Sequence, residues 1–285
     1  MNMNRLLYIC LLMAASSLMI HAQQQRRDST TAKSDSVVIH SATASADTLR
    51  KIKNDAFNVG EYLKFDINYE FVTAGEAIMK VGDTTYNGRR CFNIEFLVNS
   101  KPFFNWVYKV EDKYRTIVDA EGLFPWKFEQ HIREGGYARD FTADFDQAKH
   151  IAKTSEGEHP IPAYVQDMMS AFYMARTIDY SGFKVGQKVH MQNFYKDSTY
   201  ELDIKYKGKQ QIEVDAGTFN CIVVEPLAKE GGLFKSDGKV YVWLTDDDRK
   251  MPVKVSTQIV IGSIDSDLVF YRGLNGPLNS KVEDN

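Results

Sequence analysis

The sequence is poor in cysteine, in net positive charge and in long hydrophobic runs. Only 3 cysteines occur in 285 residues, too few for a disulfide-built scaffold, and their spacing does not form a zinc knuckle. The 35 basic and 38 acidic side chains give a net charge of −3, so we expect no nucleic-acid partner. Beyond residue 22 no apolar run is long enough to span a bilayer, so we expect no integral membrane span. The remaining composition, 44% hydrophobic and 26% charged, is that of an ordinary globular protein.

Familiar catalytic and cofactor motifs are missing as well. The chain contains no G-x-S-x-G elbow, no G-x-G-x-x-G turn and no phosphate-binding loop. We therefore expect no cofactor and prefer a non-enzymatic role. Catalytic triads can assemble from residues far apart in sequence, so a hydrolase with a dispersed site stays an open alternative.

Two polar clusters resemble metal sites, but each has a simpler interpretation. The acidic run Asp246–Asp248 is followed at once by Arg249 and lacks the alternating ligands of a calcium loop, so we predict a hairpin tip. Glu156, Glu158 and His159 lack the paired anchors of a zinc site, so we predict a solvated loop. No metal site is expected.

The first 22 residues have the pattern of a secretory signal peptide. Arg5 precedes an apolar run from Leu6 to Ile20, and His21-Ala22 ends on a small residue, which predicts cleavage near Ala22. We expect a soluble mature protein in a periplasm or outside the cell. Residues 23–55 are rich in Gln, Ser, Thr, Ala and Asp, which predicts a disordered polar tether.

The compartment predicted for the mature chain bears on its two cysteines, Cys91 and Cys221. Oxidising compartments permit them to pair in a disulfide. Both lie in strand-like contexts, which favours two buried thiols that behave as small hydrophobic side chains.

Residues 56–272 are dominated by period-two alternation, which is typical of β-strands. Turn signals separate about fourteen such runs, among them Ala74-Gly75 and Asn87-Gly88. Short turns join antiparallel neighbours, so we predict a meander. A sheet of that size curls or closes. Residues 273–285 contain Gly273, Gly276 and Pro277, and we expect a flexible tail.

One stretch breaks the strand rhythm. Pro162 suits a first helical turn, and apolar residues then recur at helical spacing, which predicts a buried α-helix near residues 163–178. The predicted fold class is mainly β: a single large curled antiparallel β-sheet or half-open barrel with this helix against its concave face.

Four strings of the sequence resemble a known family. They are FNVGEYLKFDINYEFVTAGEAIMKV, DMMSAFYMAR, AGTFNCIVVEP and VYVWLTDDDRKMPVKVSTQIVIGSIDSDL. They are similar to the DUF3108 family of exported bacterial proteins of unknown function, over nearly the whole span from Phe57 to Arg272. The resemblance implies an antiparallel β domain like the curled sheets of lipoprotein carriers. It implies no activity and no catalytic residues.

Large apolar side chains are the remaining functional signal. Between sheet and helix they could line a cavity for a lipid or another apolar small molecule, with methionines as an adaptable surface. The candidate lining residues are Phe103, Phe104, Trp106, Tyr108, Trp126, Met168, Met169, Phe172 and Met174. We therefore predict a role in lipid traffic or envelope maintenance. The alternative is a structural or interaction module that presents a strand edge or an aromatic patch to an envelope protein.

Overall fold

The structure is a computed structural model that describes residues 49–106, 108–228, 239–259 and 262–283. The predicted signal peptide and tether residues 23–48 lie outside these ranges. The described residues form one α-helix, α3 (Met168–Ala175), a 3-10 turn, η2 (Pro102–Phe104), and fourteen strands. The strands are β1 (Tyr62–Tyr69), β2 (Val72–Tyr86), β3 (Arg89–Ser100), β4 (Glu111–Asp119), β5 (Pro125–Glu134), β6 (Tyr137–Asp146), β7 (Ile151–Thr154), β8 (Gly157–Pro160), β9 (Lys188–Tyr195), β10 (Ser198–Val214), β11 (Gly217–Ala228), β12 (Val240–Thr245), β13 (Pro252–Gln258) and β14 (Ser263–Arg272).

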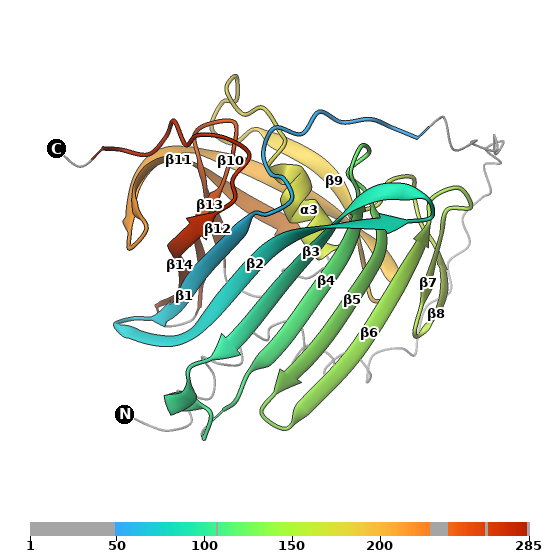
Figure 1. Ribbon diagram of the computed structural model, residues 1–285, viewed down its shortest axis with the longest axis horizontal. Coiled ribbons are helices and arrows are strands. Elements are labelled where there is room, and N and C mark those ends of the chain that lie inside the picture. The colour runs from blue at the N-terminus through green and yellow to red at the C-terminus, as the bar shows by residue number, and fades with distance from the viewer. Residues whose placement is uncertain (1–48, 107, 229–238, 260–261, 284–285) are drawn as a thin grey trace.

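All fourteen strands belong to one antiparallel sheet that curls around α3 (Figure 1). The strand order is β8-β7-β6-β5-β4-β3-β2-β1-β14-β13-β12-β11-β10-β9, so each strand pairs with its neighbour in sequence except where β1 meets β14. The strands β8 and β9 form the two edges, and the segment that carries α3 connects them. The prediction of a single large curled antiparallel sheet with one buried helix is confirmed.

The first two predicted turns have different outcomes. Asn87-Gly88 forms the expected tight turn, with φ angles of 50° and 75°. The turn predicted at Ala74-Gly75 is wrong, because the chain reverses at Glu70-Phe71 instead, where Glu70 has a φ of 51°. Gly75 lies inside β2, where an added Cβ would come within 2.8 Å of the carbonyl oxygen of Asn99. This glycine permits a close approach of two strands.

The helix is shorter than the predicted range of residues 163–178. Tyr164 has a φ of 58°, which no helix accommodates, and Gln166 forms a parallel bridge with Asn193 of β9. Residues 163–166 are therefore not helical, Gln166 pairs with the sheet edge, and α3 occupies only the central part of the predicted segment.

Asp167 determines where the helix begins. Its carboxylate accepts hydrogen bonds from the backbone N–H groups of Met169 and Ser170, and the Ser170 hydroxyl accepts one from the Asp167 N–H. The Thr116 hydroxyl donates to the same carboxylate at 2.6 Å and thus ties the helix start to β4. The cap therefore fixes the start of α3 against strand β4.

Burial of this cap predicts a pH dependence of stability. Burial raises the pKa of Asp167 from 3.8 to about 6, although its hydrogen bonds with Thr116 and Ser170 oppose the rise. Between those pH values the folded state binds more protons than the unfolded state, so the free energy of unfolding falls as pH rises. Asp167→Asn keeps a capping oxygen and removes the titration. Urea unfolding at pH 4 and pH 7 should show about 2 kcal/mol more loss in the wild type than in the variant. Equal losses in both proteins would contradict the assignment.

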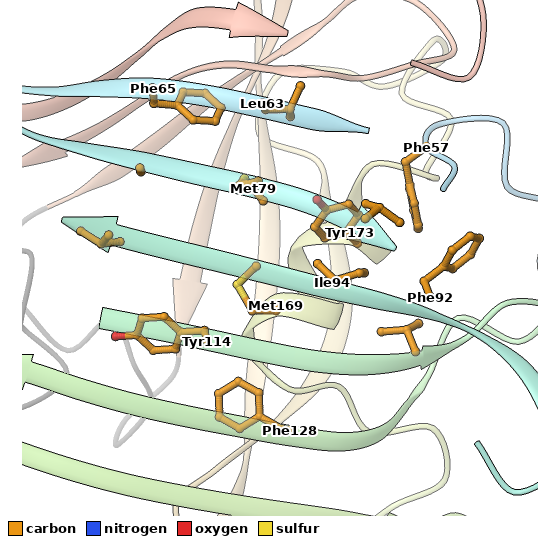
Figure 2. Close-up of a cluster of buried hydrophobic side chains, with 14 of the residues drawn as sticks. Phe57, Leu63, Phe65, Met79, Phe92, Ile94, Tyr114, Phe128, Met169 and Tyr173 are labelled. Atoms are coloured by element: carbon orange, nitrogen blue, oxygen red, sulfur yellow. The ribbon is translucent and has the colours of Figure 1, made fainter. Parts of the chain in front are cut away.

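The concave face of the sheet is packed with side chains (Figure 2). Met169 and Tyr173, on one side of α3, join a large cluster with side chains of β1–β5. Ala171 and Ala175, on another side, pack with a second cluster formed by β10, β11 and β12. Thus α3 fills the space between the two halves of the curled sheet.

Cys91 and Cys221 are both buried and free, which confirms the favoured interpretation of two unpaired thiols. Burial raises the pKa of Cys91 to about 11 and that of Cys221 to about 12, so neither thiol is activated at neutral pH.

The described ends of the chain contact the sheet. Arg50, in the predicted tether, donates from its guanidinium to the carbonyls of Gly122 and Leu123. Ser280, in the predicted tail, donates from its backbone and its hydroxyl to the Asp247 carboxylate at 3.1 and 2.7 Å. Asp247 lies in the predicted turn between β12 and β13, so this turn anchors the C-terminal segment.

Candidate functional site

A small cavity lies where Met168 of α3 meets strands β5, β6 and β9. It measures about 10 Å³, which is room for one water molecule and too little for an acyl chain. The surrounding side chains are Phe128, Gln130, Phe141, Phe145, Met168, Phe194, Tyr195 and Lys196.

A much larger groove opens beside the helix at the sheet edge formed by β9. We call it the α3–β9 groove. Its volume is about 400 Å³, within the usual range for small-molecule sites. It is lined by Arg50, Ala163, Tyr164, Gln166, Met174, Ile178, Val189, His190, Met191, Gln192 and Glu201.

The helix and the edge strand provide the apolar part of this groove. Met174 lies in the last turn of α3, and Ile178 lies three residues beyond the end of the helix. Val189 and Met191 alternate along β9 and are half-buried against the helix side, as period-two spacing requires. Two methionine side chains can adjust to the shape of an apolar ligand.

The opposite rim of the groove is polar, and its side chains are already paired. The Gln192 side-chain amide donates to Glu201 at 3.0 Å across β9 and β10. His190 Nδ1 lies 2.6 Å from a carboxylate oxygen of Asp203, to which Lys188 also donates. These pairs tie the edge strand to β10.

Arg50 is a cation of the groove that has no acidic partner among the described residues, since Glu201 accepts from the neutral amide of Gln192. Its guanidinium stacks 4.5 Å from the ring centroid of Tyr164, and its backbone N–H donates to the Tyr164 hydroxyl at 3.0 Å. Its two side-chain hydrogen bonds go to neutral carbonyls, and within the described part of the chain it has no carboxylate partner. Burial lowers the pKa of Arg50, because the charge is partly removed from water.

The nine side chains that we predicted to line one cavity lie in different parts of the structure. Phe103 and Trp106 are 76% and 78% exposed, near the turn η2, far along the chain from any groove residue. Phe104 is half-buried beside them, and Tyr108 packs over Gly135. Trp126 is buried in a separate cluster, where it donates to Asp119.

The four candidates on the helix segment also diverge. Met169 is buried in the main cluster, and Phe172 is half-buried between the two clusters. Met168 borders the small cavity, and Met174 lines the α3–β9 groove. Sequence reasoning therefore identified one groove residue and missed Arg50, Tyr164 and β9. The sequence shows the alternation of Val189 and Met191, but this pattern does not distinguish an edge strand from a central one.

The carboxylates and the serine considered for metal binding or catalysis have structural partners. Glu156 pairs with Arg139, and Glu158 pairs with Lys153. The Ser170 hydroxyl is held in the helix cap. Across the described ranges, no group of three or more His, Cys, Asp or Glu side chains is arranged to hold a metal ion.

The chain is similar to one protein family and to several solved structures. A family model described as "Protein of unknown function (DUF3108)" matches residues 64–269, whereas no curated protein matches the chain. A crystal structure of a beta-barrel-like protein of DUF1849 from Brucella abortus is 10% identical, covers 76% of this chain and 98% of its own, and has a TM-score of 0.51. A putative exported protein with a YmcC-like fold from Bacteroides fragilis is 11% identical, with coverage of 78% and 99% and a TM-score of 0.32. In the described ranges no helix has the length and apolarity to cross a bilayer.

Proposed function

The chain belongs to the DUF3108 family of proteins of unknown function, and we propose that it is an exported, non-enzymatic protein that holds an acyl chain with an acidic head group in the α3–β9 groove. The observation that carries the proposal is the combination of an apolar wall with Arg50, whose charge has no carboxylate partner among the described residues. Export is proposed from the signal-peptide pattern of residues 1–22. Lipid traffic or envelope maintenance is the process that such a protein would serve.

The apolar wall of the groove suits an acyl chain. Met174, Ile178, Val189 and Met191 expose hydrocarbon and thioether surface to it. Removing apolar surface from water contributes roughly 25 cal/mol per Å². A ligand that covers these four side chains gains affinity from its tail alone.

Arg50 supplies the specificity for an acid. A partly buried cation without a counter-charge is costly, and a carboxylate or phosphate that reached it would form a charge-assisted hydrogen bond. Because Gly122 and Leu123 hold the guanidinium in place, little side-chain freedom is lost when the head group binds.

Calorimetric titration with palmitate tests both parts of this proposal. Ala163 is exposed and lines the groove, so Ala163→Trp should fill it and weaken palmitate binding by about tenfold or more. Arg50→Met should weaken palmitate binding about 10- to 100-fold, because one charge-assisted hydrogen bond is lost. The corresponding primary alcohol should bind the wild type and Arg50→Met equally.

Ala138→Trp is the matched control, because Ala138 is exposed on β6 and does not line the groove. It should bind palmitate like the wild type. If Ala163→Trp also bound palmitate like the wild type, the ligand would not occupy this groove. If Arg50→Met weakened acid and alcohol alike, the guanidinium would not recognise the head group.

A further inference from the structure

Large exposed apolar side chains gather at one end of the sheet. Phe71 is 101% exposed and Val72 is 51% exposed at the turn between β1 and β2. Phe103 and Trp106 are 76% and 78% exposed in the connection between β3 and β4. Elsewhere in the described part of the chain, Val185 and Phe270 are the other large hydrophobic side chains with comparable exposure. Isolated exposed hydrophobic residues are ordinary, but four on two turns form a distinct surface.

The strand register makes these two turns neighbours. The pairing of β2 with β3 continues to Gly75 and Ser100, and the Lys101 N–H donates to the Ala74 carbonyl at 2.9 Å one step further. Both turns therefore leave the sheet at the same end, as Figure 1 shows for the β1–β2 connection and η2. We call the exposed side chains of Phe71, Val72, Phe103 and Trp106 the aromatic tips, after the three aromatic rings among them.

The local geometry makes the tips project from the sheet. Glu70, with a φ of 51°, turns the chain so that Phe71 lies beyond the last paired residues of the hairpin. Pro102 begins the 3-10 turn η2, which contains no buried residue and keeps its side chains outside the core. Phe103 touches its neighbour Phe104 edge to face, with ring centroids 5.3 Å apart.

We propose that the aromatic tips insert into the interface of a lipid bilayer, independently of any ligand in the α3–β9 groove. Tryptophan and other aromatic rings favour the boundary between acyl chains and head groups. Two separate protruding turns can enter a fluid interface, whereas a protein partner would need matching pockets for each ring.

The charges near the tips indicate which lipids suit this contact. Lys101 is already engaged with Asp66 and Glu76, and Lys109 pairs with Glu111. The net charge of the whole chain is −3, so no general attraction to an anionic surface exists. The contact is therefore apolar, and we expect binding to zwitterionic bilayers with little dependence on salt.

Trp106 provides a local reporter for the test. Of the three tryptophans, Trp126 is 8% exposed and Trp243 is half-buried, so a change on vesicle addition reports Trp106. With phosphatidylcholine vesicles, the emission of the full chain should shift to shorter wavelength, and Trp106→Phe should abolish the shift. In a flotation assay, Phe71→Ser combined with Phe103→Ser should lower vesicle partitioning by about tenfold or more.

Val185→Ser is the matched control, because Val185 is 71% exposed away from the tips, and it should float like the wild type. The groove-filling Ala163→Trp should also float like the wild type, which separates this inference from the proposed ligand. Absence of both the emission shift and flotation, or equal flotation of the Phe71→Ser/Phe103→Ser variant, would overturn the proposal. Capture of a protein partner by the tips, with no vesicle binding, would overturn it as well.

Discussion

Replacement of Arg176 by methionine is expected to lower the free energy of unfolding by about 3–5 kcal/mol, because it leaves the carboxylate of Glu61 buried without a partner. Both side chains are 0% exposed. Their two hydrogen bonds, from Nη1 to Oε1 and from Nη2 to Oε2, each measure 2.7 Å. Burial disfavours the charge on Arg176, but the adjacent Glu61 more than compensates and raises the pKa of the guanidinium.

The surroundings of this ion pair explain why the loss should be large. The guanidinium also donates to the carbonyls of Ala56, Arg249 and Lys250, so it joins the chain before β1 to the β12–β13 turn. Its plane lies over the rings of Phe57 and Tyr173, at 5.4 and 5.0 Å from their centroids. Three distant segments thus depend on one side chain.

Urea unfolding of single and double variants checks this prediction. Arg176→Met and Glu61→Leu should each be strongly destabilised, whereas the double variant Arg176→Met/Glu61→Leu should lose less than the sum of the two single losses. Lys153→Met removes the exposed pair between Lys153 and Glu158 and should cost less than about 1 kcal/mol. An Arg176→Met protein within about 1 kcal/mol of the wild type would contradict this role of the buried pair.

Gly273→Ala should also destabilise the protein strongly, by roughly 3 kcal/mol. Gly273 follows β14 with a φ of 68°, and an added Cβ would lie 1.9 Å from the carbonyl oxygen of Gly60. The carbonyl oxygen of Gly60 is a backbone atom and the added Cβ is bonded directly to the backbone. Neither can move without shifting the chain before β1 or the end of β14.

The matched control for this variant is Gly182→Ala. At Gly182 an added Cβ meets nothing within 4 Å, and the backbone suits any residue. Thermal unfolding should therefore show no loss, or a gain of up to about 1 kcal/mol from the less flexible unfolded chain. Equal melting temperatures for Gly273→Ala and Gly182→Ala would mean that Gly273 does not pack against Gly60.

Side-chain alternation and turn residues were sufficient to predict one antiparallel sheet, because every strand pairs with a neighbour in sequence. They did not locate the turn at Glu70-Phe71 or the pairing of β1 with β14. The helix boundaries could not be predicted from spacing. Apolar spacing continues on both sides of α3, whereas the bridge of Gln166 to β9 and the Asp167 cap mark where the helix begins. The four sequence strings that resemble the DUF3108 family also contain residues that stabilise the fold. Glu61, Arg176 and Arg249 come from three of them and meet at the buried ion pair.

The groove was less predictable than the fold because it depends on which strands become edges. β9 is an edge because it does not pair with its neighbour in sequence, β8, whereas β14 pairs with β1 at the opposite ends of the domain. Arg50 lies in a segment of tether-like composition, and its neighbours Gly122 and Leu123 are distant in sequence. The aromatic string around Phe103 and Trp106 stood out in the sequence, but its composition does not distinguish a cavity lining from an exposed turn.

Photo-crosslinking with a diazirine-bearing palmitate can show whether an acyl chain occupies the α3–β9 groove, because it locates the bound chain along the sequence. The full chain is irradiated with the bound probe, and the modified peptides are identified by mass spectrometry. We predict adducts confined to the stretches that line the α3–β9 groove, which are residues 163–166, 174–178 and 189–192 together with Arg50 and Glu201. Adducts concentrated on Phe128 and Met169, beneath the concave face, or spread evenly over the surface would contradict it.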